Sequence, residues 1–409
     1  MRMRRPVLVA ALAAATFVPA LGLHAEESME VVSRVLARVP LVDGHNDAPW
    51  QLGETFAGDL DAFDFADLSE AAATMHTDIA RLRRGGVGGQ FWAVFVPMDL
   101  PPGEIVTACL EQIDLVKRLV ARYDALEMAG SAADVERIHA SGRIASMIGV
   151  EGGHCIDGSL AVLRQLSELG VGYMTLTHWS SLPWVDAATD RALSDGLSEL
   201  GEEVVGEMNR LGMLVDLSHV SAAAMHDALD LSSAPVIFSH SGARAINPHP
   251  RNVPDDVLRR LPVNGGIVMV NFGAYFVATE MTAWYAERKA EQARLETLHP
   301  GAGSTVDEGV ARWEALNPRP TVPLAGLLDH IDHIRRVAGI DHVGLGSDFD
   351  GVGTLPEGLE DVSGYPTLLA GLVDRGWSED DIAKLAGLNI LRVMREAEEV
   401  GVRLRAEPR

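Results

Sequence analysis

Short apolar runs alternate with amphipathic stretches along most of this chain. Eight of the runs have the length of strands: Pro40–Gly44, Gly89–Val96, Arg143–Val150, Val171–Thr177, Met213–Ser218, Pro235–Ser239, Gly266–Asn271 and His342–Ser347. The stretches between them repeat apolar residues at helical spacing, as in Glu104–Tyr123, Leu160–Leu169, Leu197–Leu211, Ala222–Leu231, Val322–Ala338 and Ser378–Glu399. This alternation predicts an α/β fold built on a parallel sheet.

Polar side chains stand where the apolar runs end. Seven of the eight runs end in such a residue: His45, Glu151, His178, His219, His240, Asn271 and Asp348. Eight strand–helix units are the number in a (β/α)8 TIM barrel, and an open doubly wound sheet is the alternative. A barrel gathers functional groups at the carboxyl ends of all its strands, whereas an open sheet concentrates them at one switch point. Because polar residues end seven of the eight predicted strands, the sequence favours the barrel.

Two segments depart from the regular pattern. The second predicted strand ends in Pro97-Met98-Asp99 and offers no comparable polar residue. Between the seventh and eighth strands, Ala274–Pro320 is longer than a normal connection and rich in charged helix formers. We expect a helical insertion there, over the rim of the barrel or at an oligomer surface.

The N-terminus has the pattern of a secretory signal peptide. An apolar run from Pro6 to Leu23 follows Arg2, Arg4 and Arg5 and ends in small residues near Ala25. A membrane anchor is the alternative, although the run is barely long enough to span. We expect cleavage after about Ala25, a single barrel domain over residues 26–409, and export to the periplasm or the exterior without a membrane anchor.

Charge and cysteine content narrow the function classes. The formal charge of −24 becomes −27 when residues 1–25 and their three arginines are removed. So acidic a protein repels nucleic acid and anionic membranes, and part of its charge could offset bound cations. The two cysteines, Cys109 and Cys155, do not make a disulfide framework. Two buried free thiols are the favoured interpretation, with pairing left open.

Five of the strand-end residues have the chemistry of metal ligands. His45 and Asp47 point to the same face of a strand and could grip one ion, or form a capped turn or salt bridge. His219 and His240 repeat one arrangement, since each follows a serine at the end of an adjacent strand. Glu151 follows a run that should be buried, where an arginine or metal ions would have to offset its charge. A metal site at the rim is predicted, which indicates hydrolysis.

Two further strand-end residues have alternative interpretations. His178 could be another ligand, or it could donate a hydrogen bond to negative charge that develops on a substrate oxygen. Asp348 has Asp350 as a rival on the same face, and an Asx-type turn is the structural alternative.

Arg251 is the candidate for binding an anionic group. It could pair with Asp255 or Asp256, or it could hold a substrate carboxylate through a bidentate fork. We interpret the other histidines as structural or surface residues: His76, His139, His154, His226, His249, His299, His330, His333 and His342.

Six motifs, taken together, resemble those of the membrane (renal) dipeptidases. They are His45-Asn46-Asp47-Ala48-Pro49-Trp50-Gln51-Leu52, Glu151-Gly152-Gly153-His154, Asp216-Leu217-Ser218-His219-Val220-Ser221, Phe238-Ser239-His240-Ser241, Arg251-Asn252-Val253-Pro254-Asp255-Asp256 and Gly346-Ser347-Asp348-Phe349-Asp350-Gly351. They extend in order from about residue 40 to 395 and so cover nearly all of the mature chain. The resemblance implies a (β/α)8 barrel with two zinc ions that hydrolyses free dipeptides through a hydroxide bridging the metals. Whether L-Xaa–D-Xaa pairs are among the substrates is left open.

The matching motifs also imply a division of roles. His45 and Asp47 would hold one Zn2+, His219 and His240 the other, and Glu151 would bridge the two.

The remaining implied roles concern the substrate. His178 resembles the histidine that polarises the scissile carbonyl, Arg251 the anchor of the substrate's C-terminal carboxylate, and Asp348 the acid that meets the substrate amine and moves the proton. Trp50 is expected to wall the pocket. Met98 stands where the mammalian enzymes have a cysteine, and the lipid-anchor signal of those enzymes is missing. That disulfide and membrane attachment are therefore not implied, whereas a homodimer is.

Two other function classes remain open. The first is a different metal-dependent barrel hydrolase, such as a deaminase, lactonase or β-lactam hydrolase. Such barrels commonly begin with His-x-His, whereas this chain has His45-Asn46-Asp47. The second is a non-catalytic binding protein on the same barrel. A barrel that had lost its catalytic function should also have lost at least one predicted metal ligand or Asp348, yet all are present.

Overall fold

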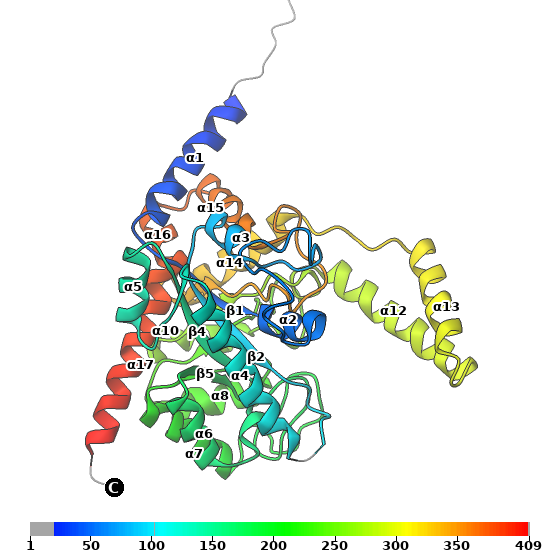
Figure 1. The fold of residues 1–409 in the computed structure, drawn as a ribbon, viewed down its shortest axis with the longest axis horizontal. Helices are drawn as coiled ribbons and strands as arrows, with labels where there is room; N and C mark the ends of the chain where they lie inside the picture. The colour runs from blue at the N-terminus through cyan, green and yellow to red at the C-terminus, as the bar shows by residue number, and fades with distance from the viewer. Residues whose placement is uncertain (1–19, 102, 408–409) are drawn as a thin grey trace, which may run out of the picture.

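Eight parallel strands form a closed barrel in the computed structural model, which describes residues 20–101 and 103–407 (Figure 1). The strands are β1 (Leu41–Asn46), β2 (Val87–Phe95), β4 (Ile144–Glu151), β5 (Val171–Thr175), β6 (Leu214–Asp216), β7 (Ile237–Phe238), β8 (Ile267–Val270) and β9 (Val343–Leu345). Each pairs with the next, and β9 pairs with β1, which closes the sheet. The (β/α)8 prediction and all eight predicted strand positions are confirmed.

One additional strand was not expected. β3 (Leu126–Met128) pairs in parallel with the start of β4, Leu126 lying opposite Ile144. Its three residues include a glutamate, so the segment has no apolar run that sequence patterning could detect.

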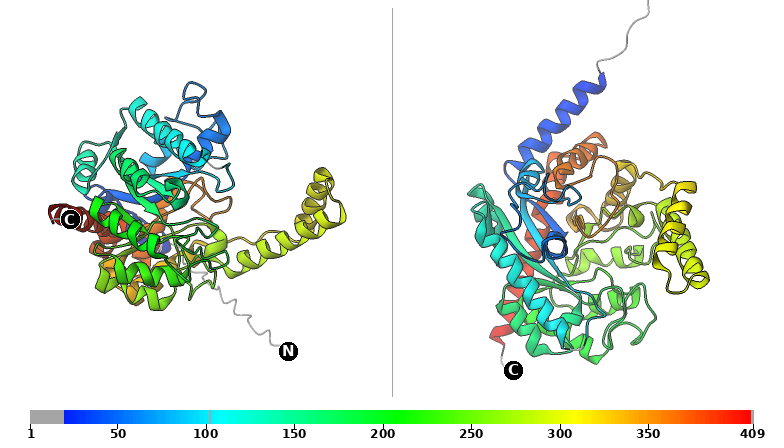
Figure 2. Two further views of the ribbon diagram at one scale, coloured as in Figure 1. Left: turned by 90° about the horizontal axis from the view of Figure 1, so that it is seen from below. Right: turned by 45° about the vertical axis from the view of Figure 1, so that its right-hand side comes forward.

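Helices cover the outside of the barrel (Figure 2). The longer ones are α1 (Ala20–Leu36), α4 (Glu104–Arg122), α5 (Ala132–Ala140), α6 (Leu160–Glu168), α7 (Glu199–Leu211), α8 (Ala222–Leu231), α14 (Leu324–Ala338), α15 (Tyr365–Asp374) and α17 (Asn389–Ala406). Short helices occupy the connections: α2 (Ala48–Phe56), α3 (Ile79–Arg84), α9 (Asp255–Leu258), α10 (Leu261–Asn264) and α16 (Glu379–Ala383). The helices expected from the pattern are confirmed within about two residues at most ends.

The last predicted helix consists of three pieces. A π-helical turn, Lys384–Leu388, joins α16 to α17. A Cβ on Gly387 would lie 2.0 Å from the Pro40 carbonyl oxygen, so glycine is needed where this turn approaches the start of β1. Most of the predicted signal peptide, residues 1–19, lies outside the described residues.

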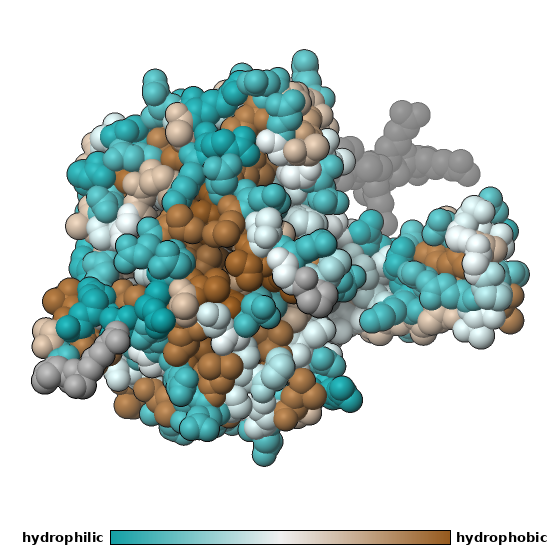
Figure 3. All heavy atoms as spheres, turned by 60° about the horizontal axis from the view of Figure 1, so that its bottom comes forward, coloured by the Kyte–Doolittle hydropathy of each residue, from teal (hydrophilic) through white to brown (hydrophobic). Residues whose placement is uncertain are grey.

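The predicted insertion is a helical hairpin that extends away from the barrel (Figures 1 and 2). It consists of α11 (Ala274–Val277), α12 (Thr279–Leu298) and α13 (Gly303–Leu316), which confirms the helical interpretation. The far part of the hairpin has a small core of its own, formed by Leu295, Val306 and Val310. On the face shown in Figure 3 its surface is mixed, with hydrophilic residues around a hydrophobic patch.

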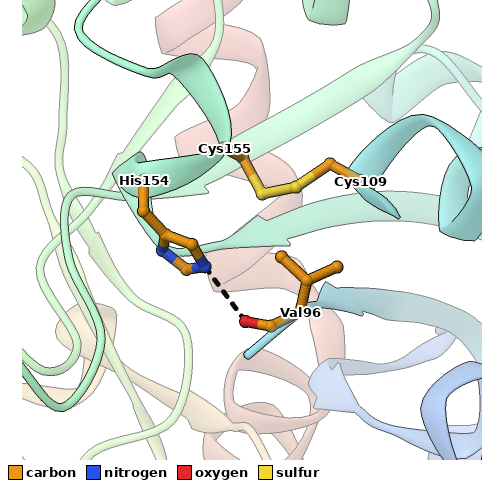
Figure 4. The surroundings of a disulfide bond; sticks show 4 residues. All are labelled: Val96, Cys109, His154 and Cys155. Atoms are coloured by element: carbon orange, nitrogen blue, oxygen red, sulfur yellow. Dashed lines mark hydrogen bonds between the residues drawn. A yellow bond between two sulfur atoms is a disulfide. The ribbon is translucent and has the colours of Figure 1, made fainter. Parts of the chain in front are cut away.

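The two cysteines form a disulfide, so the expectation of free thiols was wrong (Figure 4). Cys109 lies on α4, and Cys155 lies on a 3-10 turn, η1 (Gly153–Ile156), that follows β4. Because β2 and β4 are neighbours, the helix after β2 packs against the turn after β4. The sequence separation of 46 residues concealed this proximity. Among the described residues, no helix combines the length and apolarity needed to cross a membrane.

Candidate active site

One oxygen of Glu151 is the centre of the histidine cluster. Glu151 is the last residue of β4, and its Oε1 lies close to the Nε2 atoms of four histidines: His219 at 3.0 Å, His240 at 3.3 Å, His178 at 3.5 Å and His45 at 3.6 Å. The Nε2 atoms of His219 and His240 are themselves 3.0 Å apart. Four imidazoles from four different strand ends thus converge on one buried carboxylate, as the barrel topology requires.

The carboxylates extend this cluster. The Oδ2 of Asp47 lies 3.3 Å from the Nε2 of His45. Three overlapping groups bring candidate ligand atoms within 4.8 Å of one another: His45–Glu151–His240, Glu151–His178–His219 and His45–Asp47–Asp348. All five predicted metal ligands belong to these groups, together with His178 and Asp348. Buried imidazole nitrogens and carboxylate oxygens are donors that bind zinc and other transition metals, so the residues fit a metal centre.

Hydrogen bonds behind two histidines orient them toward the cluster. The Nδ1 of His45 lies 2.7 Å from the hydroxyl of Tyr173, which donates to the Gly44 carbonyl at 3.1 Å. The Nδ1 of His240 lies 2.8 Å from the Oγ of Ser239, which donates to Asp216 at 2.6 Å. Since both hydroxyl protons are committed, each Nδ1 is the N–H donor, and each Nε2 faces the cluster.

Sequence reasoning did not assign roles to these supporting residues. Tyr173 and Asp216 lie within predicted strands, and their side chains are completely buried. The only available signal was a polar side chain inside an otherwise apolar run, which does not by itself indicate its partner.

The protonation states of His219, His240 and Glu151 suit metal binding. Burial alone would lower the pKa of His45, but the neighbouring Tyr173, Glu151 and Asp47 raise it well above its usual value. Burial lowers the pKa values of His219 and His240 well below the usual value, so both are neutral near pH 7. Burial alone would raise the pKa of Glu151, but the neighbouring His178 and His45 outweigh it and lower that pKa well below its usual value. Glu151 is therefore a carboxylate. Burial lowers the pKa of His178 to about 4.

Three of the six described non-glycine residues with a positive φ lie at the same rim. His219, Asp348 and Asp350 have φ angles of 70°, 65° and 65°, in the left-handed region that non-glycine residues seldom adopt. Strain of this kind persists where the surrounding structure enforces it, most often at functional sites.

The structure separates Asp348 from its rival Asp350. The Oδ2 of Asp348 accepts a hydrogen bond from Asn271 at 2.8 Å, and the residue belongs to the cluster with His45 and Asp47. Burial, and then repulsion by Asp47, raise the pKa of Asp348 well above its usual value. Asp350 accepts instead from the backbone N–H of His76 at 2.6 Å.

Arg251 is buried beside the cluster without a carboxylate partner among the described residues. It is 1% exposed and donates to the Ser241 hydroxyl at 3.4 Å and to the His240 carbonyl at 3.3 Å. The alternative partners lie elsewhere: Asp255 pairs with His333 at 2.7 Å, and Asp256 with His226 at 3.1 Å. The guanidinium is therefore available to an anionic ligand.

Most of these groups border one cavity of about 680 Å³. Asp47, Glu151, His178, His219, Arg251 and Asp348 line its inner part. Trp50, Phe95, Trp179, Tyr275 and Phe276 supply aromatic walls. The ring of Trp50 meets that of Phe95 edge-on at 5.0 Å. The cavity has the size and mixed lining of small-molecule sites.

The fold and site define a class: barrel proteins with a cluster of candidate metal ligands at the carboxyl ends of the strands. A sequence model of the membrane dipeptidase family (Peptidase family M19) matches residues 29–408. This chain belongs to that family.

Individual relatives agree. The chain is 41% identical over 366 residues to Dipeptidase 3 of Rattus norvegicus. The matched region covers 88% of this chain and 66% of the rat protein. The fold is similar to that of the probable dipeptidase PvdM from Pseudomonas aeruginosa, with 24% identity, a TM-score of 0.78, and coverage of 92% and 99% of the two chains. It is also similar to a Rhodobacter sphaeroides metallopeptidase crystallised with a phosphinate mimic of the dipeptide L-Ala-D-Ala. That likeness has 26% identity, a TM-score of 0.71, and coverage of 88% and 99%.

Proposed function

We propose that this protein is a zinc-dependent dipeptidase that hydrolyses free dipeptides, L-Xaa–D-Xaa pairs among them. The observation that carries the proposal is one cavity that holds a histidine–carboxylate cluster around Glu151, the acid Asp348 and the buried Arg251. Family membership and the dipeptide mimic bound by the Rhodobacter sphaeroides relative support the same substrate class.

Two zinc ions are proposed for the cluster. His45 and Asp47 would hold one ion, His219 and His240 the other, and Glu151 would bridge them. When bound, such ions polarise the substrate carbonyl and make water acidic enough to attack near neutral pH.

The chain's own residues perform the remaining steps. The Asp348 carboxylate takes a proton from the attacking water and passes it to the amide nitrogen of the leaving residue. His178 donates from an imidazole N–H to the carbonyl oxygen as negative charge develops there. Arg251 binds the free carboxylate through its guanidinium, which restricts substrates to those ending one residue beyond the scissile bond. Trp50 walls the substrate pocket.

A dipeptide panel, including L-Xaa–D-Xaa pairs, combined with metal analysis tests the main proposal. We expect release of free amino acids and about two zinc ions per chain. A two-zinc protein inert toward every dipeptide would contradict it.

Glu151→Gln tests the bridging role. We expect loss of bound zinc together with activity, because the amide cannot supply the negative charge on which four imidazoles converge. Normal zinc content and normal rates would remove Glu151 from the centre.

Arg251→Ala tests carboxylate binding. We expect a KM for dipeptides raised by about tenfold or more, since a charged hydrogen bond is lost from a buried site. A C-terminally amidated dipeptide is the control, because its binding does not depend on this contact. An unchanged KM for free dipeptides would contradict the assignment.

Export is proposed on the N-terminal pattern described above, and the disulfide supports an oxidising compartment. N-terminal sequencing of the exported protein should find a start near Glu26, and an uncleaved cell-bound chain would contradict this. We also propose a homodimer, which light scattering of the purified protein tests.

A further inference from the structure

The outer wall of the cavity comes from the hairpin and not from the barrel. Six residues of α12 line it: Tyr285, Arg288, Lys289, Gln292, Ala293 and Glu296. Their spacing alternates between three residues and one, which places them in a single stripe along one helix face. The hairpin therefore contributes a specific surface to the same cavity that contains Arg251 and Asp348.

Lys289 is the uncommitted cation of this stripe. The chain has three lysines, Lys117, Lys289 and Lys384, so a lysine in a cavity wall is a rare residue in this protein. Among the described residues, no ion pair or hydrogen bond engages the Lys289 ammonium. By contrast, Arg288 donates to Glu314 at 2.6 Å, and Lys384 pairs with Asp341 at 2.6 Å.

The sequence of α12 leaves this ammonium without a counter-ion within one turn on its own face; the nearest acid of the stripe, Glu296, lies two turns away. The positions three and four residues away hold alanine, tyrosine and glutamine. Glu291 pairs with Arg294 at 2.7 Å, and Glu296 accepts from Gln292 at 2.9 Å. An anionic group entering the cavity would therefore meet a free charge.

A continuous aromatic wall connects Arg251 with Lys289. The guanidinium lies over the ring of Phe276, 5.3 Å from its centre. Phe276 and Tyr275 have ring centres 3.9 Å apart, and Tyr275 and Tyr285 have ring centres 5.6 Å apart. Lys289 is one helical turn beyond Tyr285. The wall therefore extends from the proposed carboxylate site at Arg251 to the helix that carries Lys289.

The negative charge around the cavity makes a free cation in its wall significant. The inner cavity contains the carboxylates of Asp47, Glu151 and Asp348, and the whole chain has a formal charge of −24. A substrate with a second carboxylate would be repelled unless a local cation offset this field.

We propose that Lys289 recognises an acidic side chain on the C-terminal residue of the substrate, so that Xaa-Glu and Xaa-Asp dipeptides form a favoured class. The inference rests on the proposed dipeptidase function and extends it to substrate choice. Because Lys289 is exposed, its ion pair predicts a preference of about fivefold, which decreases as salt screens the charges.

The test compares Ala-Glu with Ala-Gln, which differ in charge but hardly in shape. The ratio of their kcat/KM values is measured in the wild type, in Lys289→Gln, in Lys289→Arg and in the control Lys117→Gln, whose residue lies on α4 outside the cavity. We expect Lys289→Gln to lower the ratio about fivefold through KM, whereas Lys289→Arg and Lys117→Gln keep it.

The outcomes separate the two proposals. A ratio unaffected by Lys289→Gln overturns the subsite, and so does an effect confined to Glu-Ala against Gln-Ala, which would place the contact at the N-terminal residue. If no dipeptide were hydrolysed, the dipeptidase function would fail. The affinities of the same zinc-loaded variants for Ala-Glu and Ala-Gln would then be measured by calorimetry. The ratio of the two affinities would test the role of Lys289 in place of the kcat/KM ratio.

Discussion

The hydroxyl of Tyr173 determines which nitrogen of His45 faces the cluster. Its proton goes to the Gly44 carbonyl, so its oxygen accepts from the Nδ1–H of His45. Loss of this acceptor would leave a buried N–H unpaired and free the ring to rotate or change tautomer.

Tyr173→Phe should therefore weaken zinc binding by about 10- to 100-fold while the protein stays folded. Competition with a coloured chelator measures the affinity, and circular dichroism checks the fold. Tyr123→Phe is the matched control, because that hydroxyl accepts from the Phe65 N–H away from the cluster. Equal zinc affinities in the two variants would contradict the role of Tyr173.

His330 is a buried histidine whose two nitrogens are both used by the backbone. Its Nδ1 accepts from the Ala243 N–H at 2.9 Å, and its Nε2–H donates to the Val277 carbonyl at 3.0 Å. Burial lowers its pKa to about 4, from a usual value of 6.5. Above pH 6.5 both the folded and the unfolded chain have this residue neutral.

Between pH 6.5 and 4 the unfolded chain binds a proton at His330 that the folded chain does not, so stability should decrease as pH falls. The contribution is about 3 kcal/mol and is complete near pH 4. In denaturant titrations, His330→Gln should be less stable at pH 7.5 but lose less stability on acidification. The exposed His299→Gln should follow the wild type. If the free energy of unfolding of His330→Gln changed with pH in parallel with that of the wild type, this assignment would be contradicted.

At the scale of elements, the sequence was sufficient to predict those features in which the local pattern and the barrel topology agree. The apolar runs predicted all eight barrel strands, and the residues at their ends predicted Glu151 and the four converging histidines, because a parallel barrel brings strand ends together.

Features that depend on packing between distant segments could not be predicted. The pairing of Cys109 with Cys155 requires the register of β2 against β4. The contact of α12 with the cavity requires the direction in which the hairpin leaves the barrel, and charged helix formers alone do not specify that direction. The hydrogen bond from His45 to Tyr173 likewise joins strands that are not adjacent in the sequence.

The disulfide secures the segment that follows Glu151. Cys155 lies four residues after this carboxylate, on a turn that also places His154 against the Val96 carbonyl at 3.0 Å (Figure 4). Cys109→Ser/Cys155→Ser should lower the free energy of unfolding by about 2–4 kcal/mol. Reductant should lower the Tm of the wild type but not that of the double variant. A double variant as stable as the wild type would contradict a stabilising role.

At the scale of the whole molecule, metal binding should stabilise the fold. The cluster joins residues from six strand ends, and its carboxylates repel one another without a cation. Removing zinc with a chelator should lower the Tm, and adding free zinc at about 100 times its Kd should restore about 3 kcal/mol. Differential scanning calorimetry measures the change. Glu151→Gln should show a smaller response, and a Tm insensitive to zinc in the wild type would contradict metal binding at this rim.

The hairpin and the barrel should lose structure at different denaturant concentrations. Leu295, Val306 and Val310 form the small far core of the hairpin, whereas the strands at the cluster are buried throughout the barrel. Elements with few buried apolar contacts open locally at lower free energy than the global transition. Moderate denaturant should therefore release the α12 wall while the cluster around Glu151 stays assembled. The enzyme would then lose its discrimination between C-terminal side chains before it loses its ability to cut the peptide bond.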